Sequence, residues 1–212
     1  EDFPGHTLGV WFFGNEYPFL SWMNHLGIST EGGDDGVTVL KQGFNVDPLL
    51  QGQADCISTM TYNEYGQILD AGYGEDELVN FNYLEQGVGM LEDGLYVLEE
   101  DLGDEAFRDR MARFVRASMK GWDWAAENPE EAAQIVVDND MTGAQTLEHQ
   151  VYMMGEVAKL TEGSNGALDP EAYQQTVDTL LSAVSEENPA ITEEPEGAWT
   201  HDITDEALEG GS

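Results

Sequence analysis

The chain has 212 residues, of which 43 are Asp or Glu and only 7 are Lys or Arg, so its formal net charge is −36 at pH 7. Hydrophobic residues make up 41% of the chain and aromatic residues 10%, which is enough to bury a core, so the acidity does not predict disorder. The length fits one globular domain or two small ones. Nucleic acid and anionic lipid surfaces would repel so negative a body, which argues against both as partners.

The motifs of metal, disulfide and nucleophilic chemistry are absent from the sequence. Cys56 is the single cysteine, which excludes an internal disulfide and a multi-cysteine zinc site. The four histidines show no metal-ligand spacing, and no GxSxG, Walker or GxGxxG motif occurs. We therefore expect no catalytic residue, no metal and no cofactor. No apolar run predicts membrane insertion or a signal-peptide core, and a chain that begins with Glu rather than Met is expected to be a mature or truncated piece.

Acidic residues are spread through the whole chain rather than gathered in one tail. An excess of one charge destabilises a compact state by self-repulsion unless salt screens it. The screening length falls from about 10 Å at 0.1 M salt to about 3 Å at 1 M. This distribution predicts a halophilic source and a stability that rises steeply toward molar salt.

Most of the few basic residues lie in one short stretch of the chain, at Arg108, Arg110, Arg113, Arg116 and Lys120. Residues 113, 116 and 120 would share one face of a helix. Two interpretations are open: these side chains pair with nearby Asp and Glu, or they form a docking surface for an acidic partner.

The first third of the chain alternates between strand and helix patterns. In chain order, we predict a buried strand over 7–13, a helix over 19–26, a strand over 37–42, a helix with Asp47 as N-cap, a strand over 56–60 and a helix over 62–72. This alternation is typical of an α/β fold with a mostly parallel sheet.

The rest of the chain changes in character. Residues 78–98 carry several glycines and predict strands with sharp joints that cross between lobes. Helices are then predicted from 104 to 128, from Pro129 with Asn128 as N-cap, over 144–160 and over 170–185, followed by a loop with one short turn near 204–208. Trp11, Trp122 and Trp124 are assigned to the core.

Two predicted strand-to-helix junctions carry polar residues that the fold alone does not require. Each has an amide, a carboxylate and a tyrosine: Asn15, Glu16 and Tyr17 after the first strand, and Tyr62, Asn63 and Glu64 after the third. Ligands of open α/β sheets bind beyond the carboxyl ends of the strands. Aromatic stacking and a hydrogen bond to a carboxylate suit a flat heteroaromatic ligand with an amino group. A turn or cap role explains each residue singly, so this prediction depends on the two clusters together.

Several segments resemble the substrate-binding proteins of ABC transporters, in the branch for thiamine-pyrimidine precursors and riboflavin: GVWFFGNEYPFLSWM, VDPLLQGQADCISTMTYNEYGQILDAG, GVGMLEDGLYV, RFVRASMKGWDWAAENPEEAAQIV and PEGAWTHDITDEAL. The resemblance implies an α/β fold of the type II periplasmic-binding-protein-like kind, with two lobes of mostly parallel sheet, a helical C-terminal part and hinge closure over the ligand. Residues 1–82 would then form the second lobe. Residues 83–212 would be the crossover and the helical part of the first lobe, whose N-terminal part the chain lacks.

The resemblance also implies a function and a site. It implies the binding component of an ABC importer for an aminopyrimidine or a related vitamin such as riboflavin, with permease subunits as partners and the six junction residues as ligand contacts. Glu64 is the first candidate to accept a hydrogen bond from the exocyclic amine. The resemblance implies a periplasmic or extracellular location. A lipid anchor on the N-terminal part that the chain lacks is one option.

Two rival functions fit the sequence less well. Relatives with the same fold are thiamine pyrimidine synthases, which depend on a lysine that holds pyridoxal phosphate and on a cysteine-rich motif. This chain has one cysteine, and its only lysines are Lys41, Lys120 and Lys159, which argues against that chemistry. A sulfonate or nitrate receptor would need cationic groups at the junctions, and the two junctions supply none.

Overall fold

The computed structural model describes residues 2–183 and 190–210, which fall into two compact units. Unit 1 comprises Glu1–Met60, Ile68–Asp93 and Asp169–Glu196, and unit 2 comprises Thr61–Gln67, Gly94–Leu168 and Gly197–Ser212. Helix α3 (Glu64–Asp70) begins in unit 2 and ends in unit 1. The expected lobes 1–82 and 83–212 remain a prediction about the whole protein.

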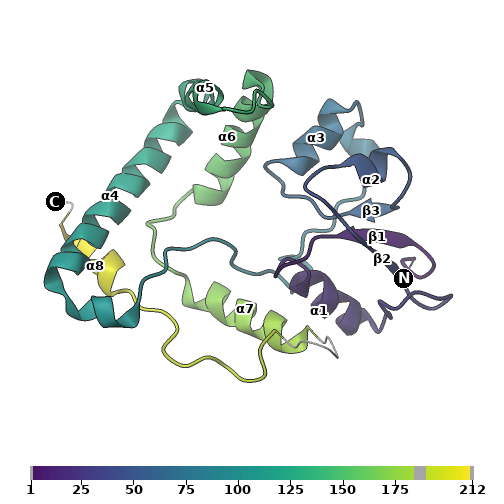
Figure 1. Cartoon of the computed structure of the whole chain (residues 1–212), viewed down its shortest axis with the longest axis horizontal. Coiled ribbons are helices and arrows are strands. Elements are labelled where there is room, and N and C mark those ends of the chain that lie inside the picture. The colour runs from purple at the N-terminus through teal and green to yellow at the C-terminus, as the bar shows by residue number, and fades with distance from the viewer. Residues whose placement is uncertain (1, 184–189, 211–212) are drawn as a thin grey trace. The chain divides into compact units, whose positions relative to one another are not determined.

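Unit 1 contains a small parallel sheet and the helices that follow its strands. Its elements are β1 (Thr7–Val10), α1 (Tyr17–Leu26), β2 (Thr38–Lys41), α2 (Asp47–Leu50), β3 (Cys56–Ile57), the 3-10 turn η1 (Glu75–Glu77) and α7 (Pro170–Ser182). The strand order is β2-β1-β3, and both pairings are parallel, with Leu8 opposite Val39 on one side and Cys56 on the other. The predicted α/β class with a parallel sheet is therefore confirmed (Figure 1).

The core of unit 1 lies between the sheet and α1. Phe19, Trp22 and Met23 share one face of α1 at the spacing of an amphipathic helix and are almost fully buried against Leu8 and Val10.

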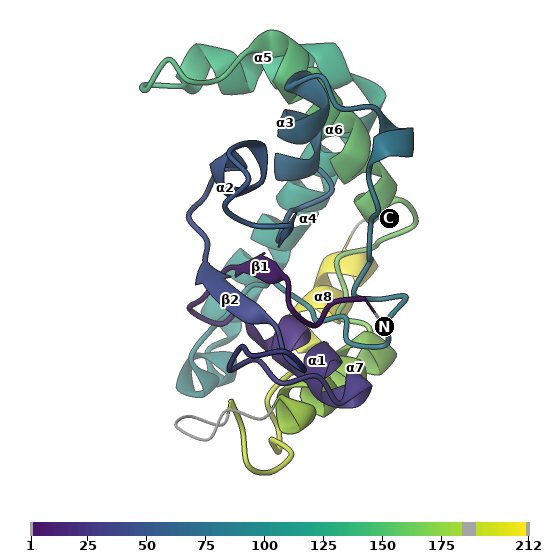
Figure 2. The same cartoon turned by 90° about the vertical axis from the view of Figure 1, so that its right-hand side faces the viewer.

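Within unit 1, helices α1 and α7 lie side by side in both views (Figure 1, Figure 2). The hydroxyls of Ser21 and Ser182 are 2.7 Å apart, which joins the two helices across 161 residues of sequence.

Unit 2 is helical in the part of it that the structure describes. Its elements are η2 (Glu99–Gly103), α4 (Glu105–Glu127), α5 (Pro129–Asn139), α6 (Leu147–Thr161) and α8 (Asp202–Glu209). Helix α4 packs against α6 and α8, and α5 packs against α6. Among the described residues, no helix combines the length and the apolar character that crossing a membrane requires.

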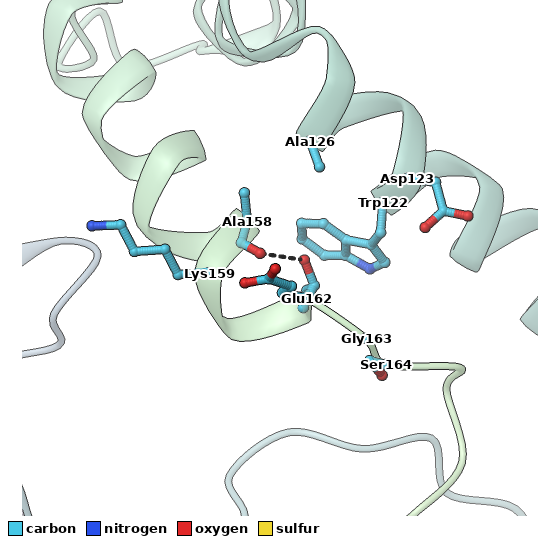
Figure 3. A pocket seen from close by; sticks show the side chains of 9 residues that line it. Trp122, Asp123, Ala126, Ala158, Lys159, Glu162, Gly163 and Ser164 are labelled. Carbon is cyan, nitrogen blue, oxygen red and sulfur yellow. Dashed lines mark hydrogen bonds between the residues drawn. The ribbon is translucent and has the colours of Figure 1, made fainter.

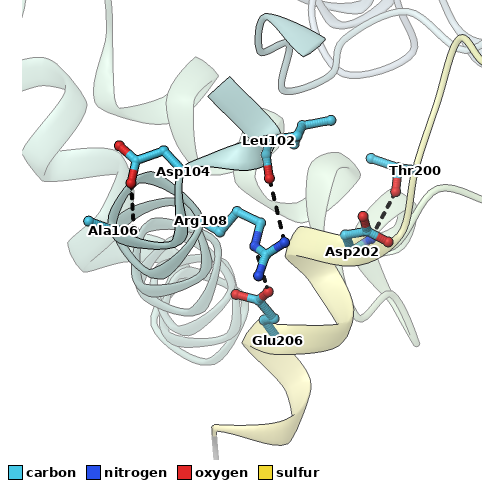
Figure 4. A network of polar contacts seen from close by, with 7 residues as sticks. All are labelled: Leu102, Asp104, Ala106, Arg108, Thr200, Asp202 and Glu206. Atoms are coloured by element: carbon cyan, nitrogen blue, oxygen red, sulfur yellow. Dashed lines mark hydrogen bonds and ion pairs between the residues drawn. The ribbon is translucent and has the colours of Figure 1, made fainter. Parts of the chain in front are cut away.

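Three arginines of α4 pair within the chain, and two of them hold α8. Arg108 Nε lies 3.0 Å from a carboxylate oxygen of Glu206 (Figure 4). Arg116 Nη1 donates to the carbonyl oxygens of Glu206 and Ala207 at 3.0 and 3.1 Å, which satisfies carbonyls at the C-terminal end of α8. Arg113 pairs with Asp109 at 3.1 Å. The structure thus favours intramolecular pairing over a docking surface for these three arginines.

The strands predicted over 78–98 are wrong, since that segment contains no strand or helix. Some of its backbone groups bond within the segment in turns, and two bond to side chains of α7 instead of to a neighbouring strand. The N–H of Leu91 donates to Thr176 Oγ1 at 2.8 Å, and Thr179 Oγ1 donates to the carbonyl of Gly89 at 3.3 Å. Backbone groups satisfied in this way do not need a sheet.

Other predicted boundaries and burial states also change. The strand predicted over 7–13 ends at Val10, and the short turn predicted near 204–208 is the full helix α8, because Ile203 and Ala207 bury one face against α4. Asp47 is the first residue of α2 rather than its cap. The last two residues of the helix predicted over 170–185 lie outside the described residues.

Of the three tryptophans assigned to the core, one is buried and two are exposed. Trp11 is buried, at 7% exposure, and its Nε1 donates to the carbonyl of Gly43 at 3.1 Å. Trp122 and Trp124 are 44% and 40% exposed, so their assignment to the core is wrong. The face of α4 that packs on α8 includes Ala112 and Val115, and neither indole belongs to that cluster.

Candidate functional site

The polar side chains of the first junction, between β1 and α1, bond to their own loop. Glu16 Oε2 accepts the N–H of Gly14 at 2.8 Å, and Asn15 Nδ2 donates to the carbonyl of Phe12 at 3.3 Å. Asn15 is exposed, whereas Glu16 and Tyr17 are half-buried. Glu16 occupies the N-cap position of α1 without a side-chain cap hydrogen bond. Its carboxylate therefore closes the turn rather than capping the helix.

The same junction contains an exposed aromatic side chain, Phe13, that the sequence did not indicate as a site residue. Phe13 is 89% exposed and has a φ of +66°, which is the left-handed region that bulky residues rarely adopt. The Nζ of Lys41, at the end of β2, lies 4.6 Å from the centre of its ring. Strain of this kind is found most often at functional positions. The sequence placed Phe13 inside a buried strand, and only the Gly14 that follows it hinted at a turn.

The second junction, between β3 and α3, contains a buried carboxylate. Glu64 is 5% exposed, and Asn63 Nδ2 donates to its Oε1 at 2.9 Å. The carbonyl of Asn63 accepts the N–H of Gln67 at 3.1 Å, which makes Asn63 part of the first turn of α3. A buried carboxylate is tolerated only when hydrogen bonds replace its water. The Asn63–Glu64 pair therefore places a donor and an acceptor side by side.

The orientation of the Asn63 amide is set by two further side chains. Its Oδ1 accepts from Gln67 Nε2 at 3.2 Å and lies 3.0 Å from His149 Nε2. With Oδ1 engaged there, Nδ2 is directed toward Glu64.

Helix α6 supplies the contacts that hold this junction within unit 2. Tyr152, one turn after His149, donates its hydroxyl to the carbonyl of Thr61 at 2.8 Å. The His149 and Tyr152 rings are stacked, with centres 6.1 Å apart. A Cβ on Gly66 of α3 would overlap the Tyr152 ring, so the close approach requires glycine there. No local sequence pattern connects these residues to the junction, because they lie far apart in the chain.

The six predicted ligand residues fall into both units. Asn15, Glu16 and Tyr17 belong to unit 1, and Tyr62, Asn63 and Glu64 to unit 2. Within its own unit, the second group forms the hydrogen-bonded pair described above, whereas the first group bonds to backbone of its own loop. That both groups contact one ligand remains a prediction.

A separate hollow of about 530 Å³ lies between α4 and α6 in unit 2. Figure 3 shows the Trp122 indole facing Ala158 and Glu162 across it. None of the six predicted residues lines this hollow. The residues that the structure describes include no group of three or more His, Cys, Asp or Glu arranged to hold a metal. Burial raises the pKa of the Cys56 thiol, which makes it a poor nucleophile.

The fold and the second junction define an α/β protein with a small parallel sheet, a helical part and a buried carboxylate–amide pair. The model of the NMT1/THI5-like family matches residues 1–132, and the chain belongs to this family. This membership confirms the resemblance to the thiamine-precursor branch of substrate-binding proteins that the sequence motifs indicated.

One relative is named for the ligand that it binds. The formylaminopyrimidine-binding protein of Halalkalibacterium halodurans is 25% identical to this chain over 201 residues. The match covers 91% of this chain and 58% of the relative, so the chain spans less than two thirds of that protein's length.

Proposed function

We propose that this protein binds a pyrimidine precursor of thiamine, an aminopyrimidine, through the second junction. The observation that carries the proposal is the Asn63–Glu64 pair, in which a buried carboxylate and an oriented amide N–H lie side by side. The similarity to a formylaminopyrimidine-binding protein supports the same ligand class.

An aminopyrimidine has the pattern of groups that complements this pair. Its exocyclic amine donates, and the ring nitrogen beside the amino-bearing carbon accepts. Glu64 would accept from the amine, and Asn63 Nδ2 would donate to the ring nitrogen. A hydrogen bond to a charged carboxylate is about twice as strong as a neutral one, which would make Glu64 the main anchor. Tyr62 is half-buried beside the pair and is the aromatic side chain proposed to stack on the ring.

The wider role is part of the same proposal. The protein would be the binding component of an ABC importer, with two lobes of the type II periplasmic-binding-protein-like kind closing over the ligand. The closed form would deliver the ligand to permease subunits at the membrane, from a periplasmic or extracellular location. The other predicted contacts, Asn15, Glu16 and Tyr17, would face the same ligand in the closed form.

Titration calorimetry and thermal shift with formylaminopyrimidine, thiamine and riboflavin test the ligand. A ligand that binds only the folded state raises the melting temperature, and the rise grows with the logarithm of the ratio of ligand concentration to Kd. Stabilisation by formylaminopyrimidine and not by riboflavin is expected. Stabilisation by riboflavin alone would move the proposal to the riboflavin branch, and no response to any of the three would overturn it.

The rival enzymatic function has a distinct signature. A pyridoxal-phosphate enzyme would develop a visible absorbance band on addition of that cofactor, and substitution of one lysine would abolish the band. In the structure Lys159 pairs with Glu156, and Lys41 lies against the Phe12 and Phe13 rings. These contacts favour structural roles for both lysines.

We also propose a halophilic source on the basis of the charge. Lys41 is the single basic residue in the sequence of unit 1, so internal ion pairs do little to offset the self-repulsion of that unit. Melting in increasing KCl tests the proposal. A melting temperature that rises steeply up to molar salt is expected, and a flat response would contradict it.

A further inference from the structure

The start of α6 is arranged around a side chain of the candidate site. His149 lies in the first turn of α6, where its backbone N–H donates to the Oγ1 of the N-cap Thr146 at 3.2 Å. Its Nε2 lies 3.0 Å from Oδ1 of Asn63, 86 residues away in sequence. The histidine is therefore held by its own helix while its ring reaches a different element.

The chemistry of this contact determines which atom carries the proton. An amide oxygen only accepts hydrogen bonds, so Nε2 of His149 must be protonated. Gln67 Nε2 donates to the same oxygen at 3.2 Å, which gives Oδ1 two donors. If the Asn63 amide were turned over, its Nδ2 would face these two donors and its oxygen would face the Glu64 carboxylate. The contact of two acceptor oxygens would be repulsive, and Nδ2 would meet the N–H groups of Gln67 and of a His149 protonated at Nε2, so the Glu64 carboxylate and the two donors together favour the observed orientation.

We propose that His149 is a positioning residue, which holds the Asn63 amide so that Nδ2 points to Glu64 and to the ligand. This inference rests on the proposed function, because it assumes that Asn63 and Glu64 contact the aminopyrimidine. His149 itself does not touch the ligand and acts through Asn63.

The neighbouring contacts show that α6 is fitted to this junction over more than one residue. Tyr152 follows His149 at the spacing that places both on one helix face. It donates to the carbonyl of Thr61 at 2.8 Å, and Gly66 provides the space for its ring. The helix face thus bonds both Thr61 and Asn63, the two residues on either side of Tyr62.

Three variants of the protein separate positioning from folding. His149→Leu removes the donor while keeping an apolar side chain, and His149→Gln replaces it with an amide N–H. His25→Leu is the matched control, since His25 is an exposed histidine on α1 of unit 1. Loss of one neutral hydrogen bond corresponds to about fivefold to tenfold in affinity. We expect that loss of formylaminopyrimidine affinity for His149→Leu, recovery to within about twofold for His149→Gln, and no change for His25→Leu.

A ligand analogue gives a readout that a purely structural role would not move. In the aminopyridine analogue of formylaminopyrimidine, the ring nitrogen next to the amino-bearing carbon is replaced by C–H, so Asn63 has no acceptor on the ligand. His149→Leu should weaken binding of the parent compound and leave binding of this analogue unchanged. Equal weakening of both compounds would show a general structural role and overturn the positioning proposal. Unchanged affinity for both compounds would overturn it as well.

Nuclear magnetic resonance of the ring nitrogens tests the geometry without any ligand. In isotope-labelled protein, His149 is assigned by the signal that disappears in His149→Gln, and its Nε2 is expected to carry the proton. A neutral ring protonated at Nδ1 would overturn the proposal. If wild-type protein bound no aminopyrimidine while Nε2 carried the proton, the proposed function would fail and the contact between His149 and Asn63 would stand.

Discussion

The same three residue types, Asn-Glu-Tyr, follow β1 at positions 15–17 and lie at the start of α3 at positions 63–65. In the first case Glu16 bonds the backbone of its own turn and Asn15 is exposed. In the second, Glu64 is 5% exposed, and Asn63 is bonded to a helix 86 residues away. A shared triplet therefore does not specify a shared environment.

The difference arises from what packs on each junction within its own unit. On the second, α6 brings His149 and Tyr152 onto Asn63 and Thr61, and these contacts fix the amide. On the first, the side chains complete a local turn. A buried and oriented group binds a ligand more strongly than an exposed one, because it has less freedom to lose and less water to displace.

Exchanging each glutamate for glutamine should produce the largest difference between the junctions. Glu64→Gln removes a buried charge-assisted acceptor, and about 1.5–3 kcal/mol of binding energy corresponds to a loss of about tenfold to a hundredfold in affinity. Glu16→Gln keeps an oxygen that can accept the N–H of Gly14, so its effect should stay within about threefold. Calorimetric titration with formylaminopyrimidine measures both. Equal losses would show that the two junctions contribute alike.

The close packing of α3 on α6 predicts a loss of stability at Gly66. Gly66→Ala forces a methyl group into the Tyr152 ring and should lower the free energy of unfolding by about 1–3 kcal/mol. Gly155→Ala is the matched control, because Gly155 is an exposed glycine in α6 with open space around its Cβ position.

Gly155→Ala should raise stability by up to about 1 kcal/mol, since alanine is the better helix former. Urea unfolding measures both variants. In the double variant with Tyr152→Ala, the penalty of Gly66→Ala should disappear; a penalty that persists would mean that the overlap with the ring is not its cause.

Phe13 offers a smaller test of the first junction. Phe13→Gly removes the cost of a left-handed backbone at a bulky residue, about 1–2 kcal/mol of folding free energy. The greater flexibility of glycine in the unfolded chain and the lost contact with Lys41 oppose that gain. The melting temperature should therefore change little. If the exposed ring stacks on the ligand, affinity should fall about fivefold to tenfold. A large drop in melting temperature would instead assign Phe13 a structural role.

The smallest effect concerns Tyr83, which lies near the end of β3. Burial raises the pKa of Tyr83 to about 12, above its ordinary value of about 10. The unfolded chain loses this proton first, so the stability due to the neutral phenol is complete below pH 10 and is lost as the pH rises toward 12. An ultraviolet pH titration should show one late-titrating tyrosine that is missing in Tyr83→Phe. A titration curve that the substitution leaves unchanged would contradict this.

Local sequence features predicted where several helices begin and which of their faces are buried. Pro129 after Asn128 marked the start of α5, and the apolar spacing of Phe19, Trp22 and Met23 marked the buried face of α1. The family resemblance was confirmed. The strands predicted over 78–98 were wrong, because a strand pattern gives no information about whether a partner strand exists. The hydrogen bond from His149 to Asn63 could not be predicted from four scattered histidines.

Local sequence patterns are sufficient to predict the alternation of strands and helices in the first third of the chain, the parallel α/β class of unit 1, and the residue types at each junction. These properties depend on periodicity, caps and turns within a few residues of one another. Three features follow from the three-dimensional packing alone: the burial of Glu64, the orientation of Asn63 by α6, and the attachment of α8 by Arg108 and Arg116. Those outcomes depend on contacts between distant segments, whose formation is decided by the packing of the fold as a whole and not by any local pattern.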